Sequence, residues 1–467
     1  MALLHKNFFF WVKWPYNHII KPFWWIIIMG IIFLVPFLRP WWWFFAPLLL
    51  VVEVKVLYLW WIGWDVDYAK VKWVMLEIIP PKEILVPLKA FEDILSVMYG
   101  PLIDAANFRE LWCDGELPEA PFWMSWEIVS IEGSIHFYAR VMSPHRVFLE
   151  STLYSHYPEL EIQEVSDYAK DVPQNIPNEE WDLYGENFFS LSPPAYQIKT
   201  YEKFFEPQGE KISAEEKRID PINSLLESMS RLGQGEQYWA QFIISSVGDK
   251  EGRSEFEEEA KKIIGKITKR PVKKQKTLWE DVSGMIGQVI LGPQKEGSGE
   301  KATYKWAESA SASESGEREM LLTPGERETL TEVENKLKKP MFRTVVRGVY
   351  IAKRENWKSS NGKLMRTYLG HFNSTSTFLN FDGNTRTKVH YLFRKRRVFL
   401  RARRMFRSAV LRFPPYFPDR RRGSMLLSAD ELATLFHFPF KISSLAFPTI
   451  ERVEHRKGGP PSNLPIE

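Results

Sequence analysis

The side chains best suited to chemistry in this sequence are the cations near its C-terminal end. Fourteen Lys and Arg residues lie between Arg386 and Arg422, where the only acid is Asp419. Cations at this density can neutralise several phosphates, and the aromatic residues interleaved with them can stack on exposed bases. The segment therefore predicts a binding surface made by Arg394, Lys395, Arg396, Arg397, Arg401, Arg403, Arg404 and Arg407.

Three kinds of ligand fit such a basic segment, and the sequence does not decide among them. Nucleic acid comes first, because aromatic residues accompany the arginines. An acidic patch on a partner protein comes second. Anionic lipid, or plain solvation of the charges, is the third interpretation.

Motifs that would indicate catalysis are missing from the sequence. It contains no G-x-x-x-x-G-K-[ST] loop, no G-x-G-x-x-G after a strand-like run, no H-E-x-x-H and no nucleophile elbow. The 9 histidines lack metal-ligand spacing, and the single cysteine, Cys113, excludes a disulfide framework or a cysteine-based zinc cluster. We therefore expect a protein that is not an enzyme, with no cofactor, no metal and no catalytic residue.

Composition limits the class of protein further. The chain has 467 residues, which at roughly 150 residues per domain allows two or three domains. A net charge of +4 excludes a wholly basic coat protein, and 45% hydrophobic residues exclude global disorder.

Residues 1–66 are predicted to be a transmembrane anchor. The stretch 22–64 has only three charged residues, Arg39, Glu53 and Lys55. As one helix this stretch would be about 65 Å long, roughly twice the hydrocarbon thickness of a bilayer. We therefore expect an antiparallel hairpin with spans at about 22–38 and 41–62. In an alternative that stays open, the second span ends near Val52 and the remainder lies in the membrane interface.

Lysines flank the predicted hairpin on both sides. They are Lys6, Lys13 and Lys21 before it and Lys70 and Lys72 after it, whereas only Arg39 lies between the spans. By the positive-inside rule, both termini and the soluble domains should face the cytoplasm. The expected location is the inner (plasma) membrane of a bacterium, with membrane lipid as a partner.

After the predicted anchor, residues 67–170 alternate strand-like and helix-like patterns. The pattern gives a strand, a helix, a strand hairpin, a helix and a strand, at 70–79, 87–100, 122–131 with 134–142, 143–157 and 159–165. This order is that of a split βαβ, or ferredoxin-like, unit with helices on one face of an antiparallel sheet.

Residues 180–390 repeat this order with an interruption and predict a second split βαβ unit. Its strand-like and helix-like runs cover 183–202, 220–232, 238–247, 342–352 and 361–379. An insertion at 249–339 is rich in Gly, Ser and Glu at its centre and is expected to be partly disordered. Residues 391–457 hold the basic segment and a helix with Ser428 as its N-cap, and residues 458–467 resemble a linker. The expected fold class is therefore α+β: a transmembrane helical hairpin followed by two ferredoxin-like units.

Six segments together carry a resemblance to a known family. They are Trp73–Ile79, Trp126–Tyr138, Glu150–Ile162, Asp220–Met229, Gln237–Ile244 and Leu427–Pro439. With the predicted anchor before them, they resemble the N-terminal membrane-anchored region that precedes the motor domain in type IV secretion coupling proteins of ultra-small candidate-phyla bacteria. The resemblance covers most of residues 20–465, and its motifs are structural rather than catalytic.

The resemblance implies a non-catalytic membrane anchor and adaptor for a HerA/TraG-like ATPase that translocates DNA in conjugation or secretion. The partner would be a P-loop hexameric ATPase, acting in trans or supplied by a missing C-terminal domain. DNA and further copies of this chain, as a homo-oligomer, are additional expected partners. The alternative function is a stand-alone membrane-tethered nucleic-acid-binding protein that uses the Arg-rich segment 386–422.

Overall fold

The computed structural model describes the chain in several blocks. The described residues are 27, 29–44, 47, 51, 55, 58–59, 61–81, 84, 86–102, 107–114, 123–204, 220–248, 253–268, 295–296, 303–304, 322–374, 376–416 and 421–439. The chain divides into two compact units. The larger is formed by Met1–Arg253 with Lys339–Glu467, and the smaller by Ser254–Lys338.

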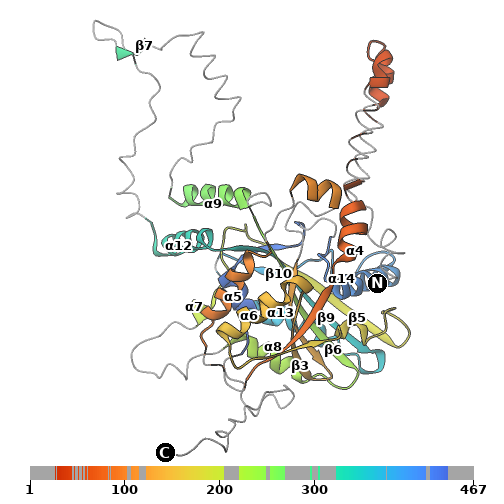
Figure 1. Ribbon diagram of the computed structural model, residues 1–467, viewed down its shortest axis with the longest axis vertical. Coiled ribbons are helices and arrows are strands. Elements are labelled where there is room, and N and C mark those ends of the chain that lie inside the picture. The colour runs from red at the N-terminus through yellow and green to blue at the C-terminus, as the bar shows by residue number, and fades with distance from the viewer. Residues whose placement is uncertain are drawn as a thin grey trace, which may run out of the picture. The chain divides into compact units, whose positions relative to one another are not determined.

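The larger unit is built on one antiparallel sheet of nine strands (Figure 1). The strands are β1 (Trp73–Ile79), β2 (Met124–Ile131), β3 (Ser134–Met142), β4 (Glu161–Val165), β5 (Trp181–Ser190), β6 (Glu236–Ser246), β9 (Met341–Lys353), β10 (Leu379–Phe381) and β11 (Met425–Ser428). They lie in the order β10-β5-β9-β6-β2-β3-β1-β4, and β11 pairs with the part of β9 that β5 leaves free.

The sheet is continuous because β2 pairs with β6, residues Met124–Ile131 against Gln237–Ile244. Both strands are buried along nearly their whole length. The prediction of a transmembrane hairpin followed by two ferredoxin-like units is therefore wrong, because strands from both predicted units belong to one α+β body with one sheet. In two separate units, β2 and β6 would each be an edge strand with backbone groups exposed to water. Here the two edges pair with each other instead.

Helices cover both faces of this sheet. One face carries α5 (Lys89–Tyr99), α6 (Arg146–His156), α8 (Pro221–Ser230), α13 (Leu364–Leu369) and α15 (Ala429–Leu435). The opposite face carries α14 (Arg394–Leu411) and the loop that follows β4. Consecutive strand residues point to opposite faces, so that Tyr350 packs in the first core and Ile351 in the second.

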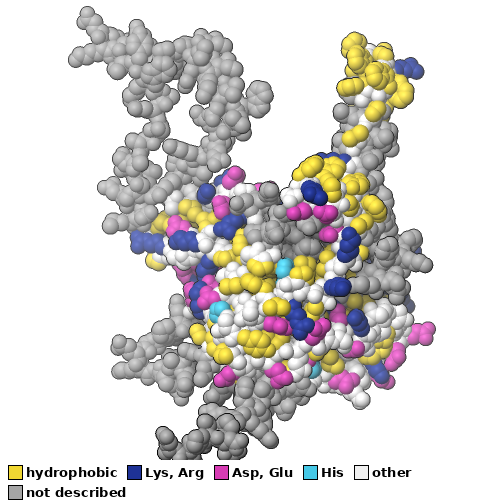
Figure 2. Space-filling model, in the orientation of Figure 1, with side chains coloured by type: hydrophobic (Ala, Val, Ile, Leu, Met, Phe, Trp, Pro, Cys, Tyr) yellow, Lys and Arg dark blue, Asp and Glu magenta, His cyan; other side chains and the backbone are white. Residues whose placement is uncertain are grey.

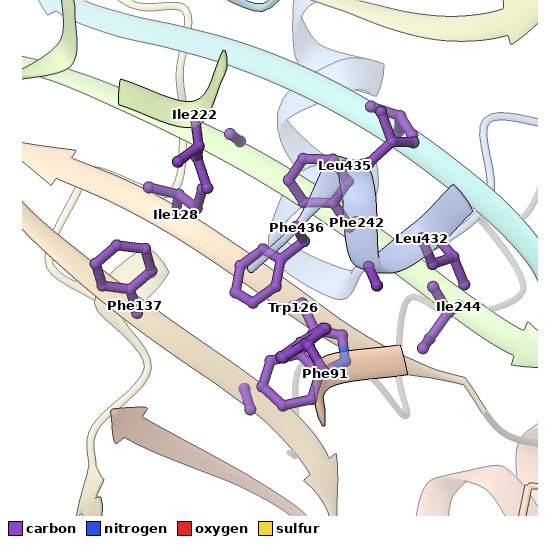
Figure 3. Close-up of a cluster of buried hydrophobic side chains, with 14 of the residues drawn as sticks. Phe91, Trp126, Ile128, Phe137, Ile222, Phe242, Ile244, Leu432, Leu435 and Phe436 are labelled. Carbon is purple, nitrogen blue, oxygen red and sulfur yellow. The ribbon is translucent and has the colours of Figure 1, made fainter. Parts of the chain in front are cut away.

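Aromatic side chains fill the centre of the first core (Figure 3). The rings of Phe91 from α5, Trp126 from β2 and Phe436 after α15 are in mutual contact, with centroids 5.2, 5.3 and 5.5 Å apart. Phe242 of β6 contacts the same Phe436 ring at 5.7 Å. Each such contact contributes about 0.5–1.5 kcal/mol beyond the area it buries. The core therefore strengthens the joint between β2 and β6.

The α15 helix begins at Ser428, as the sequence predicts. The backbone N–H of Ser428 donates to the Glu431 carboxylate at 2.8 Å and completes a capping box. Every residue of α15 is buried. This motif of the family resemblance is therefore an internal part of the core.

The smaller unit contains two helices and a short hairpin. They are α9 (Arg253–Ile267), whose first residue belongs to the larger unit, α12 (Pro324–Lys338), and β7 (Lys295–Glu296) paired with β8 (Thr303–Tyr304). In α9, Phe256, Ala260 and Ile263 are buried at helical spacing and form one apolar stripe. Most of the Gly/Ser-rich centre of the predicted insertion, and all of the linker-like stretch 458–467, lie outside the described residues.

The described residues of the N-terminal segment contradict the predicted membrane spans. Among the described residues, no helix is both long and apolar enough to cross a bilayer. Described helical residues are interrupted by a turn and a 3-10 helix at Arg39–Trp41, and the segment ends in a π-helix at Ile62–Asp67. The apolar side chains from Ile31 to Phe44 are largely exposed and form the yellow patch at the upper right of Figure 2.

Several expectations that depended on those spans are corrected with them. The spans at 22–38 and 41–62 are wrong for the described residues, because no helix among them meets the length and apolarity that the ~30 Å of hydrocarbon requires. The inner-membrane location and the cytoplasmic orientation of both ends were deduced from these spans and are therefore wrong as well. The other residues of the two spans lie outside the described part of the chain.

Gly348 of β9 provides a test of the packing across the sheet. An added Cβ there would lie 2.5 Å from the Tyr238 hydroxyl oxygen and 2.8 Å from the Cβ of Met365. Gly348→Ala should therefore lower the free energy of unfolding by about 1–3 kcal/mol, measured by urea denaturation. The control is Gly370→Ala, since nothing lies within 4 Å of a Cβ at Gly370. Equal stability of the two variants would contradict this packing.

Candidate nucleic-acid interface

The candidate surface is one long helix, α14, whose apolar side packs on the sheet (Figure 1). Ala402, Met405, Phe406 and Ala409 recur at intervals of three and four residues and are buried in the second core. The Phe406 ring lies 6.2 Å from the Trp239 ring of β6. This apolar stripe fixes one side of the basic segment on the sheet and leaves the opposite side to solvent.

All eight cations predicted from the sequence lie on α14. Five are exposed, namely Arg394, Lys395, Arg396, Arg397 and Arg404. Three are half-buried, namely Arg401, Arg403 and Arg407. The structure therefore brings the whole predicted set together on one helix, with the most exposed members in its first turn.

Arg401 and Arg397 contact neutral polar and aromatic groups. Arg401 donates to the carbonyl oxygens of Gly383 and Arg386 and to the Tyr391 hydroxyl, each at 3.0 Å. The Arg397 guanidinium lies over the Tyr391 ring, 4.9 Å from its centroid. Such contacts orient a guanidinium but leave its positive charge uncompensated.

Acids do not balance the charge of this helix. Within the described part of the chain, no ion pair is formed by Arg394, Lys395, Arg396, Arg397, Arg401, Arg403 or Arg404. Burial and the neighbouring Arg403 lower the pKa of Arg407 to about 10, which leaves Arg407 charged at neutral pH. The positive end of the helix dipole adds to the charge of the first turn. The helix therefore presents a net positive charge.

A buried ion pair fixes the C-terminal end of α14. Arg412, the first residue after the helix, has a left-handed backbone (φ 56°) and a fully buried side chain. Its guanidinium donates to Glu127 at 2.9 and 3.2 Å and to Asp167 at 2.7 and 2.9 Å. Burial alone would lower the pKa of Arg412, but these carboxylates raise it well above its ordinary value. We call Arg412, Glu127 and Asp167 the Arg412 latch.

A second buried arginine, Arg347 of β9, binds the last turn of α14 from the side of the sheet. It donates to the carbonyl oxygens of Ser408 and Phe413, each at 2.6 Å, and to the Asn187 side chain of β5 at 2.8 Å. Burial lowers the pKa of Arg347. Its partners are neutral and numerous, which compensates for the missing hydration of the guanidinium.

Gln241 and Tyr168 join the two arginine sites. The Gln241 amide donates to the Tyr168 hydroxyl at 3.0 Å and to the Ala409 carbonyl of α14 at 3.1 Å. The Tyr168 hydroxyl donates to Glu127, and burial raises the pKa of Tyr168 well above its ordinary value. The polar groups beneath α14 therefore form one connected network. Such networks position a helix more strictly than apolar contacts alone.

Sequence reasoning counted Arg412 among the basic residues but missed its partners. A signal was present, because Glu127 is the single charge within the strand-like apolar run 122–131. A lone charge at such a position implies a buried partner. Sequence alone offers no means of pairing residues 285 positions apart, as Glu127 and Arg412 are.

Two of the described histidines, His437 and His136, contact carboxylates of other elements. His437 contacts Asp220 at 2.9 Å through Nε2 and the Ala433 carbonyl at 3.0 Å through Nδ1, and it is buried. His136 contacts Glu77 at 2.6 Å through Nδ1. Among the described residues, His, Cys, Asp and Glu side chains do not form a group of three or more that could hold a metal ion.

Comparisons with known proteins assign this chain to no family. No protein-family model matches it, and no curated protein sequence matches it significantly. The geometry and charge of α14 are therefore the basis on which a function can be proposed.

The Arg412 latch predicts a large effect from a small substitution. Glu127→Gln keeps the shape of the side chain but removes the carboxylate that accepts two hydrogen bonds from the buried Arg412, which should cost about 3–5 kcal/mol of folding free energy. The triple variant Glu127→Gln, Asp167→Asn and Arg412→Met removes all three charges of the latch and should regain part of that stability. Urea denaturation of the wild type, the single variant and the triple variant measures this. A stable single variant would contradict the latch.

The latch also predicts a dependence of stability on pH. Burial would raise the pKa of Asp167, but the charge and hydrogen bonds of Arg412 outweigh burial and lower it. The ionised Asp167 therefore stabilises the fold above the unfolded pKa of about 3.9, and this stabilisation is lost as pH falls through the lower folded pKa.

We expect Asp167→Asn to lower Tm near neutral pH and to differ less from the wild type in strong acid. The control is Asp171→Asn, since Asp171 is exposed. A Tm difference for Asp167→Asn that stays constant from neutral pH down to about pH 2 would rule out this linkage.

Proposed function

We propose that the larger unit is a non-catalytic nucleic-acid-binding module and that α14 is its binding element. The observation that carries the proposal is a row of seven cations, from Arg394 to Arg404, that form no ion pair with the described residues, on a helix whose opposite side is fixed to the sheet. Because the helix is already fixed, its backbone does not have to become ordered on binding. The entropy cost of binding is therefore smaller.

The spacing of the cations fits a sugar-phosphate backbone. From Arg394 to Arg407 the helix rises about 20 Å. Arg394, Arg397, Arg401 and Arg404 are separated by three, four and three residues and so share one side of the helix. A strand lying along this side can place about four phosphates near guanidinium groups.

The choice of cation also supports a phosphate ligand. Seven of the eight candidate residues are arginine, and only Lys395 is lysine. The planar guanidinium donates two parallel hydrogen bonds to a phosphate and stacks on aromatic rings, whereas an ammonium group does neither. An acidic protein patch is the competing ligand, and failure of every nucleic acid to bind would favour it.

The family resemblance adds a setting to this proposal, in which the chain is an adaptor for a DNA-translocating P-loop ATPase. A nucleic-acid-binding helix suits such a role. Because α15 is buried in the core, contact with a motor would have to involve another surface of the chain. Co-purification of the full chain with a P-loop ATPase would support the adaptor role, and purification without one under several mild conditions would argue against it.

Neutralising the first turn of α14 tests the binding function. We expect the variant with Arg394, Lys395, Arg396 and Arg397 changed to Gln to bind nucleic acid roughly tenfold or more weakly than the wild type. The slope of log K against log salt should also become shallower by about 0.7–0.9 for each phosphate that the variant no longer neutralises. Fluorescence anisotropy with a labelled oligonucleotide measures both quantities.

The matched control removes the same charge elsewhere. Lys170, Arg231, Lys261 and Lys363 are exposed cations outside α14, and all four are changed to Gln. This variant should retain most of the affinity and most of the salt slope. Equally weakened binding in the two variants would mean that net charge, rather than α14, governs binding.

A further inference from the structure

Exposed aromatic side chains accompany the cations at the N-terminal end of α14. Tyr391, Phe393 and Phe399 are 54%, 74% and 43% exposed. They flank the run of exposed cations Arg394–Arg397, and the first turn of the helix is exposed on all sides. Large aromatic side chains are rarely left in water in such a group without a ligand that covers them.

Tyr391 is held in place although it is half exposed. Arg401 donates to its hydroxyl at 3.0 Å, and Arg397 covers its ring at 4.9 Å. Arg401 is itself fixed by two backbone carbonyl oxygens, those of Gly383 and Arg386. The ring is therefore an ordered platform that a ligand does not have to immobilise.

Phe393 is held in an unfavourable backbone conformation. Its φ is 58°, in the left-handed region, and it is the N-cap of α14 without a side-chain hydrogen bond to the helix. Glycine or asparagine would adopt this conformation more easily than phenylalanine. A bulky ring at a strained, exposed position gains nothing for the fold, and such positions are frequent at binding sites.

A duplex cannot use these rings, because its bases are already stacked on each other. In a single strand the faces of the bases are open, so that aromatic side chains can stack on the bases while arginines contact the phosphates. Resting on the proposed function, we infer that α14 and the residues before it bind single-stranded nucleic acid, with bases stacked on Tyr391, Phe393 and Phe399.

The experiment compares ligands of equal length with the full chain. The probes are labelled oligo(dT), oligo(U) and a DNA duplex, measured by fluorescence anisotropy at one salt concentration. We expect the single strands to bind at least tenfold more tightly than the duplex. Comparison of the affinities for oligo(dT) and oligo(U) shows whether single-stranded DNA or single-stranded RNA is the preferred ligand.

Two variants separate stacking from general apolar contact. Changing Tyr391, Phe393 and Phe399 to Ala should weaken single-strand binding at least tenfold and leave duplex binding nearly unchanged. Changing the exposed neighbours Leu392 and Leu400 to Ala should have less than a threefold effect on both ligands.

The variant Phe393→Gly separates binding from folding. It removes the ring and relieves the strain of the left-handed backbone. The affinity for single strands should therefore fall, whereas the Tm should not. A lower Tm with unchanged affinity would overturn the role assigned to Phe393.

The outcomes for this inference and for the proposed function are distinguishable. Failure of every nucleic acid to bind would reject the proposed function and this inference together, as would binding to anionic vesicles alone. Duplex affinity equal to single-strand affinity, with no effect of the aromatic substitutions, would reject the inference and leave the proposed function standing.

Discussion

The arrangement of the larger unit depends on compensating a buried guanidinium. Arg412 has no access to water, and a charge in that position is tolerated only with opposite charge and complete hydrogen bonding. Glu127 of β2 and Asp167 after β4 supply both. Arg347 of β9 repeats the arrangement with neutral partners from β5 and α14. Because the two arginines draw on strands from both sides of the β2–β6 joint, α14 is fixed across the whole sheet rather than on one half.

This constraint divides α14 into two functional parts. Its C-terminal half is packed on the sheet, and Phe413 just beyond it contacts Tyr68 and Trp123 at 5.8 and 5.6 Å. Those contacts connect the end of α14 with the end of the N-terminal helical segment. Its first turn projects from the body with four cations and exposed aromatic neighbours. A rigid base and a free charged end are what a binding helix needs, because little conformational entropy is lost on binding.

Local patterns allowed much of the structure to be predicted, and long-range pairing limited the rest. Alternation of apolar residues located the strands from Trp73 to Val165, and the Ser428 capping box was read correctly from spacing. The β2–β6 joint could not be foreseen, since it pairs strands that are far apart in the sequence. The local pattern around each strand suggested a separate sheet and gave no sign that the two sheets are one. The helix expected at 361–379 is α-helical only over Leu364–Leu369. The prediction of a membrane hairpin was wrong because a count of apolar residues does not reveal where a helix is interrupted. The cations of α14 were identified from composition alone, whereas the carboxylates that pair with Arg412 could be identified only from the fold.

The central claim is that α14 is the element that contacts nucleic acid. Photo-crosslinking of the full chain to a single-stranded oligonucleotide, followed by mass spectrometry of the crosslinked peptides, tests it most directly. The account predicts crosslinks concentrated between Tyr391 and Arg407, with few in the helices on the opposite face of the sheet. Crosslinks confined to other regions, with none in this stretch, would contradict it.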